Sequence, residues 1–155
     1  MVVEFRVLMV CLGNICRSPT AEAVLRARLH AHGLHEQVEV DSAGTGDWHT
    51  GDPPDARSQR HAARRGYDLS RLRARRVVEE DFHRFDLLLA MDDDNLADLE
   101  RLKPDGARAE LRLFAAAEVP DPYQGGPDGF EHVLDLVEQA SDALIQDLRQ
   151  RLGTS

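Results

Sequence analysis

The chain has 155 residues, of which 42% are hydrophobic, and a formal net charge of −9. This length and apolar content predict a single domain over residues 1–155, with a core large enough to fold unaided. The acidic balance argues against sequence-independent nucleic-acid binding, which depends on a basic surface. No basic and then apolar leader is present, and no apolar run approaches the ~20 residues that span a bilayer. We therefore expect a cytoplasmic protein that binds neither membrane nor nucleic acid.

Apolar runs of strand length alternate with helical patterns along the chain. The strand-like runs cover residues 5–10, 37–42, 85–91 and 109–114, and the helical patterns cover 19–32, 55–65, 92–102 and 130–151. Ser18 and Pro19 provide a cap and a first-turn proline for the first helix, and Gly33 and Gly66 are placed to end the first two helices. Regular alternation predicts an α/β fold in which helices cover both faces of a parallel sheet.

Cys11 and Arg17 lie on the turn between the first strand and the first helix, separated by five residues. In such a turn, backbone N–H groups and the helix N-terminus converge on one point and stabilise an anion. The same field favours the thiolate of Cys11, and the guanidinium of Arg17 can grip two oxygens of a tetrahedral anion. Arginine is disfavoured in a first helical turn. The pair therefore indicates an anion site rather than a buried cysteine beside a surface charge.

The other strand ends and the cysteine pair limit the chemistry of this site. Ligands of parallel sheets gather at the carboxyl ends of the strands, so Ser42 and Asp92 should reach the same edge as Cys11. Two cysteines on one loop make neither a disulfide scaffold nor a zinc site, and Gly33 interrupts the histidines of residues 30–35, so we expect no metal and no cofactor. A reversible Cys11–Cys16 disulfide is a further hypothesis.

These residues resemble a known family. The segment CLGNICRS at 11–18 is similar to the phosphate loop of the low-molecular-weight protein tyrosine phosphatases. DSAGT at 41–45, MDDDN at 91–95 and DPY at 121–123 resemble that family's second-strand end, third-strand end and general-acid loop. The resemblance spans essentially the whole chain. It implies a three-layer sandwich whose four parallel strands have the order 2-1-3-4, and hydrolysis of phosphotyrosine monoesters through a cysteinyl-phosphate intermediate.

Cleavage of a phosphate monoester by a thiolate needs a nucleophile, a cradle for the phosphate and a proton for the leaving group. We expect Cys11 to be the nucleophile and Asp121 to act as acid and then as base. Arg17 and the loop amides should bind phosphate. For Asp121-Pro122-Tyr123 the alternative is an ordinary turn. The expected substrate-binding residues are Leu12, Gly13, Asn14, Ile15, Cys16, Ser18, Trp48 and Tyr123.

Several supporting roles follow for the loop. Asn14 should adopt a left-handed conformation, and Gly13 should permit close backbone approach. Ser18 is placed to donate to the Cys11 sulfur, and Ser42 to brace Asn14.

Two more supporting expectations concern residues outside the loop. Asp92 can orient Arg17, cap the following helix, or do both. Trp48 and Tyr123 look like the aromatic walls that sandwich a phosphotyrosine ring in the family. For the eight arginines within residues 57–76, we expect mostly a solvated face.

The chain departs from the family pattern at two positions. Leu72 stands where a histidine is common, so the brace behind Asn14 should be reorganised or supplied by water. Gln124 follows Tyr123 where many relatives have a second tyrosine. Both departures put substrate preference and loop rigidity in question, and neither touches the reacting groups.

Other functions on the same scaffold remain as alternatives. Arsenate reductases of this type need downstream cysteines, which the chain lacks after Cys16. Relatives that act on phosphoarginine typically have threonine at the position of Ile15, so phosphotyrosine is favoured over phosphoarginine. A non-catalytic phosphopeptide-binding module would predict loss of Cys11 or Asp121. The expected partners are phosphotyrosine-bearing proteins, with a tyrosine kinase as a candidate, and the expected product is inorganic phosphate.

Overall fold

A four-stranded, all-parallel sheet forms the centre of the molecule. The computed structural model describes residues 3–123 and 125–153. The strands have the order β2-β1-β3-β4, as expected, with β1 in a central position. Their bounds are β1 Phe5–Cys11, β2 Val38–Gly44, β3 Leu87–Ala90 and β4 Glu110–Leu113.

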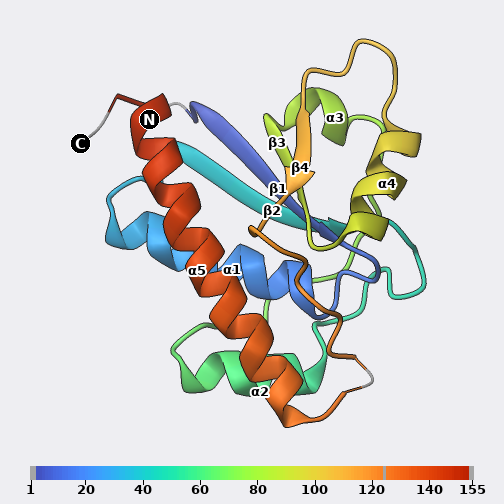
Figure 1. Cartoon of the computed structure of the whole chain (residues 1–155), viewed down its shortest axis with the longest axis vertical. Helices are drawn as coiled ribbons and strands as arrows, with labels where there is room; N and C mark the ends of the chain where they lie inside the picture. The colour runs from blue at the N-terminus through green and yellow to red at the C-terminus, as the bar shows by residue number, and fades with distance from the viewer. Residues whose placement is uncertain (1–2, 124, 154–155) are drawn as a thin grey trace.

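Helices cover both faces of this sheet, which gives the predicted three layers (Figure 1). On one face α1 packs against α5, and α2 packs against α5 at one end. On the other face lie the short α3 and α4, the latter beside β3 and β4. The helices are α1 Arg17–Ala31, α2 Ala56–Arg64, α3 Asp81–Arg84, α4 Asp93–Leu102 and α5 Pro127–Arg151. None of the described helices is long and apolar enough to cross a bilayer.

Alternate residues of β1 divide the core into two halves. Val7 and Met9 belong to the apolar cluster shared with α1 and α5, whereas Leu8 and Val10 pack with Phe82 and other residues of the opposite face. Because successive side chains of a strand point to opposite faces, a strand buried on both sides must be apolar throughout. This explains the continuous apolar run that predicted β1.

Two sequence-based expectations about helices need correction. Ser18 is not the cap of α1, because the helix begins at Arg17, its N-cap is Cys16, and the Ser18 hydroxyl is turned toward the Cys11 sulfur instead. The short helix α3 was not predicted, since four residues are too few to show a helical period. The glycine expectations are confirmed: Gly33 and Gly66 have φ of 69° and 89° just beyond α1 and α2.

Gly44, at the end of β2, allows that strand to touch the loop that follows β1. A Cβ atom on Gly44 would lie 2.7 Å from the Leu12 carbonyl oxygen, which is backbone and cannot turn aside. Next to it, the Thr45 and Gly46 amides each donate to this loop at 2.9 Å, to the carbonyls of Cys11 and Leu12. Gly44 thus packs directly on the backbone of the loop, including Gly13, whose carbonyl carbon would lie 3.2 Å from the same Cβ atom.

We predict that Gly44→Ala lowers the free energy of unfolding by ~1–3 kcal/mol, because overpacking here must displace backbone. Chemical denaturation of the purified variant measures this loss. Gly129→Ala is the matched control: it lies in α5, a Cβ there would have its nearest neighbour at 3.5 Å, and helix propensity favours alanine by up to ~1 kcal/mol. Wild-type stability in Gly44→Ala would contradict the prediction.

Candidate active site

A pocket of about 400 Å³ opens at the carboxyl edge of the sheet. Its floor is the loop between β1 and α1, and its walls are Trp48, His49, Asp121 and Tyr123. Loops that follow different strands thus meet at one edge, as expected for a parallel sheet. The structure brings the predicted nucleophile, anion-binding and acid residues to this one pocket.

Cys11 is buried and makes two polar contacts through its sulfur. The Ser18 Oγ lies 3.0 Å from Sγ, and the Asn14 backbone N–H donates to Sγ at 3.3 Å. The Ser18 oxygen already accepts a hydrogen bond from the Asn14 side chain at 2.7 Å, so its own hydrogen is available to the sulfur. The expected Ser18–Cys11 contact is present, and both donors suit a sulfur that carries negative charge.

Asn14 fixes the shape of the loop. It has φ of 58°, the left-handed conformation predicted for it. Its side-chain nitrogen donates to Ser18 and, at 3.0 Å, to Ser42, which confirms the expected brace. Its side-chain oxygen accepts from the Arg75 backbone N–H at 3.0 Å. The brace that Leu72 does not provide is thus supplied by the backbone of residue 75, while Leu72 packs against the core.

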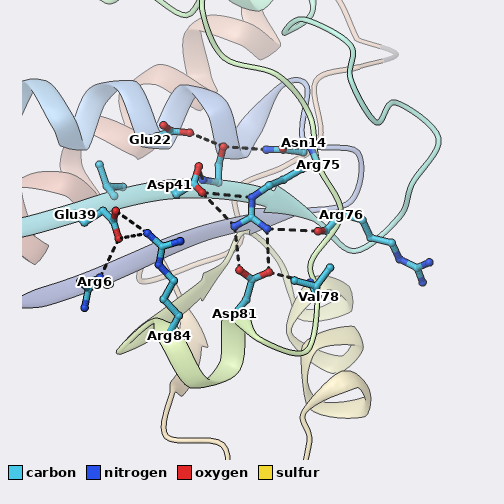
Figure 2. A network of polar contacts seen from close by, with 12 residues as sticks. Arg6, Asn14, Glu22, Glu39, Asp41, Arg75, Arg76, Val78, Asp81 and Arg84 are labelled. Atoms are coloured by element: carbon cyan, nitrogen blue, oxygen red, sulfur yellow. Dashed lines mark hydrogen bonds and ion pairs between the residues drawn. The ribbon is translucent and has the colours of Figure 1, made fainter.

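Behind Ser42 lies a buried carboxylate that the sequence analysis did not identify. The Ser42 hydroxyl donates to Glu22 at 2.6 Å, and Arg26 donates to the other carboxylate oxygen at 2.6 Å. Burial raises the pKa of Glu22, against the opposing effect of these two hydrogen bonds. Figure 2 shows the line of contacts that runs from Glu22 toward Asn14. The signal available in the sequence was a glutamate among the apolar residues 21–25 of α1.

Arg75 anchors the segment that reaches Asn14. Its guanidinium lies between Asp41, at 3.1 Å, and the buried Asp81, at 3.0 Å (Figure 2). Most of the arginines in residues 57–76 are exposed, as expected, but Arg57, Arg65 and Arg75 are only partly exposed and link separate elements. Sequence alone could not separate these three from the rest.

Arg17 is buried with its guanidinium held from two sides. Its Nη1 donates to Asp92 at 2.6 Å and to the Val119 carbonyl at 3.1 Å. Asp92 also accepts from the Asn95 backbone N–H at 2.8 Å and caps α4, so both of its expected roles occur together. Burial alone would lower the pKa of Arg17, but the neighbouring Cys11 and Asp92 raise it above its ordinary value. The guanidinium is a fixed positive charge.

Asp121 faces Arg17 across the pocket. One oxygen lies 3.7 Å from Arg17 Nη2, and the other accepts from the Tyr123 backbone N–H at 3.0 Å. The second contact makes residues 121–123 a turn as well, so the turn and the site are compatible. The carboxylate is about half exposed to solvent.

Exposed apolar side chains line the mouth of the pocket. Trp48 is 70% exposed and Tyr123 is 42% exposed, unusual values for large apolar residues that favour the predicted role as walls for a ring. His49 is a further wall residue that the sequence analysis missed, and a Cβ on Gly13 would meet its ring at 3.1 Å. Gln124 lies outside the described residues.

The amides of Gly13, Ile15 and Cys16 border the pocket and, within the described part of the chain, donate to no protein acceptor. Buried N–H groups are normally satisfied, so these donors suit a bound anion. Across the same part of the chain, no three metal-ligating side chains gather. The arrangement can hold a tetrahedral anion against a sulfur nucleophile, with a carboxyl group nearby.

Comparisons with known proteins agree with this fold and pocket. Residues 6–153 match the family model described as low molecular weight phosphotyrosine protein phosphatase. A low molecular weight protein-tyrosine-phosphatase of Streptomyces coelicolor is 46% identical, covering 96% of both chains. The crystal structure of a protein tyrosine phosphatase from Entamoeba histolytica superposes with a TM-score of 0.91 at 40% identity, covering 95% of this chain and 98% of the other. The crystal structure of a Drosophila arginine phosphatase superposes with a TM-score of 0.87 at 30% identity, covering 92% of this chain and 97% of the other.

Fold and matches together place the chain among the hydrolases of phosphoric monoesters. It belongs to the low molecular weight protein-tyrosine-phosphatase family.

Cys16 differs from Cys11 in its surroundings, and this difference is testable. Burial raises the pKa of the Cys16 thiol to about 12, with nearby Asp55 adding to the effect and a hydrogen bond from Ser58 opposing it. The raised pKa keeps the thiol protonated in the folded protein until pH approaches 12, whereas an unfolded cysteine ionises near ~8.5. In the Cys11→Ser variant at pH 8, we predict that iodoacetamide alkylates Cys16 at least ~100-fold more slowly when the protein is folded than when it is unfolded. Mass spectrometry measures both rates, and equal rates would contradict the prediction.

Proposed function

We propose that this enzyme hydrolyses phosphotyrosine in proteins through a cysteinyl-phosphate intermediate. The observation that carries the proposal is the position of the Cys11 sulfur at the floor of a pocket where Arg17 and Asp121 face each other at 3.7 Å. Arg17 and the unpaired loop amides bind the phosphate oxygens, and the amides are preorganised for charge that develops there. Leu12, Gly13, Ile15 and Cys16 provide the cradle.

The reaction proceeds in two balanced steps. The Cys11 thiolate forms a bond to phosphorus as the bond to the phenolic oxygen breaks, and Asp121 gives its proton to that oxygen. Asp121, now a carboxylate, takes a proton from water, whose oxygen attacks phosphorus and displaces the thiolate. Inorganic phosphate leaves, and Asp121 is protonated again. Ser18 stabilises the thiolate both as nucleophile and as leaving group, through the contact at 3.0 Å.

The lining of the pocket supports an aromatic substrate. Trp48 and Tyr123 provide exposed aromatic surface at its mouth, and Ile15 of the phosphate loop adds an apolar side chain to its lining. We place residues 1–155 in one catalytic domain that acts in the cytoplasm, where a reducing environment preserves the thiol. Its partners are phosphotyrosine-bearing proteins, and a tyrosine kinase supplies them. The structural relative named arginine phosphatase makes phosphoarginine the second candidate substrate.

The mechanism predicts two different losses of activity. Cys11→Ser should lower aryl phosphate hydrolysis by more than about 10³-fold, because the nucleophile is gone. Asp121→Asn should lower kcat/KM by about 10²-fold for phenyl phosphate and far less for p-nitrophenyl phosphate, whose leaving group needs no proton. Steady-state kinetics across pH measure both. Asp105→Asn, an exposed loop aspartate, is the control and should match wild type. Comparable activity in Cys11→Ser would refute the mechanism.

Ile15 provides a test of the substrate. The wild-type enzyme should prefer phosphotyrosine to phosphoarginine peptides, because a bulky apolar side chain crowds a guanidinium and suits a ring. Ile15→Thr should move the ratio of the two kcat/KM values toward phosphoarginine by about ten-fold, the scale of a small change in an apolar pocket. Phosphate release from matched peptides measures the ratio. A wild-type preference for phosphoarginine would reverse the assignment of the substrate.

A further inference from the structure

Arg57 lies in the first turn of α2, where a cation is electrostatically disfavoured. Arg17 occupies the corresponding place in α1 and belongs to the site. The guanidinium of Arg57 is held by Asp55, whose carboxylate accepts from Nε at 3.1 Å and from Nη2 at 2.9 Å. The same Nη2 donates to the Tyr123 carbonyl at 2.7 Å. Arg57 therefore joins the start of α2 to the loop that carries Asp121.

Two aromatic rings fix the guanidinium further. It lies 5.5 Å from the ring centroid of Tyr123 and 4.8 Å from that of Phe130, both within the range of cation–π attraction. Phe130 belongs to α5 and packs in one apolar cluster with Ile15 and Cys16 of the phosphate loop. The planar fork of arginine can use its edge and its face at once, which lysine cannot do.

These contacts connect the acid to the nucleophile loop. Tyr123 donates its N–H to Asp121 at 3.0 Å, while its carbonyl is held by Arg57. On the other side, the Asp55 N–H donates to the Ile15 carbonyl at 2.8 Å. A continuous path of hydrogen bonds thus runs from the phosphate loop through Asp55, Arg57 and Tyr123 to the carboxylate of Asp121.

The acid loop has few other attachments among the described residues. Before Asp121, the Val119 carbonyl is held by Arg17 and its N–H donates to Met91 at 2.7 Å. After Asp121, Arg57 holds Tyr123 by a hydrogen bond and by its ring, while Pro122 is buried and the ring of Tyr123 lies 6.2 Å from that of His49. Because Asp121 itself is about half exposed, packing does not hold its side chain in place.

We propose that Arg57 is a positioning residue that holds Asp121 at the leaving-group oxygen by fixing Tyr123 to the phosphate loop. The inference rests on the proposed role of Asp121 as general acid. A displacement of about 1 Å at a reacting group can cost as much as 10²-fold in rate. Loss of Arg57 should therefore mimic, in part, loss of the acid itself.

The test measures kcat/KM for phenyl phosphate and p-nitrophenyl phosphate, since kcat/KM covers the steps up to cleavage of the phosphorus–oxygen bond. Arg57→Ala should lower the value about ten-fold for phenyl phosphate and less than about three-fold for p-nitrophenyl phosphate. Arg57→Lys keeps the positive charge but lacks the planar fork of donors. It should also lower kcat/KM more for phenyl phosphate than for p-nitrophenyl phosphate, by a smaller factor than Arg57→Ala. It also serves if Arg57→Ala does not fold, as judged by circular dichroism.

Arg65→Ala is the matched control. Arg65 also projects from the end of α2 toward α5, where it pairs with Glu131 at 2.8 Å and Glu138 at 2.7 Å, away from the acid loop. Arg65→Ala should change kcat/KM by the same factor for both esters. When Asp121→Asn is already present, adding Arg57→Ala should lower kcat/KM for phenyl phosphate by less than a further ~two-fold, because the acid is already absent.

Equal losses for both esters in the Arg57 variants, or a full multiplicative loss on top of Asp121→Asn, would overturn the inference. Failure of the proposed function has a different signature. In that case Asp121→Asn itself would show no selectivity between the two esters. A selective Asp121→Asn with unselective Arg57 variants would leave the mechanism intact and remove only the role of Arg57.

Discussion

The left-handed backbone of Asn14 is the constraint on which the site depends. At φ of 58° the chain turns sharply enough to return its amides toward the Cys11 sulfur, and the Asn14 N–H reaches that sulfur at 3.3 Å. A single residue pays a small conformational cost there, and only a surrounding structure that over-determines it keeps it populated. Ser18, Ser42 and the Arg75 amide supply that structure, one each from α1, β2 and the segment before α3.

Arginines connect the other parts of the site. Arg17 is buried, and such a charge is tolerated only when it is paired and hydrogen-bonded on several sides, as it is by Asp92 and the Val119 carbonyl. Arg75 joins β2 to α3 through Asp41 and Asp81. Each guanidinium offers several donors in one rigid plane, so it can bridge elements far apart in the sequence. The phosphate cradle and its supports are therefore held by the same type of side chain.

The sequence predicted the parallel sheet and the loop because both are local patterns. The apolar run from Val7 to Val10 in β1 reflects burial on both faces, and the cysteine, arginine and helix start lie within eight residues. The sequence did not predict Glu22, His49 or the importance of Gly44, since each acts through contacts with residues many positions away. Ser18 shows both outcomes in one residue: the expected contact of its hydroxyl with the Cys11 sulfur is present, but it is not the helix cap that the local pattern favours, because α1 begins at Arg17.

By itself, then, the sequence determined three things: the alternation of strands and helices along the chain, the anion-binding loop, and the chemical types of the reacting groups. Periodicity, turn residues and helix electrostatics act over a few positions and can be recognised without coordinates. Only the tertiary structure decided which of the many charged side chains meet at the pocket. Arg57 and Tyr123 are 66 positions apart, and their contact at 2.7 Å exists because the fold brings the start of α2 beside the acid loop.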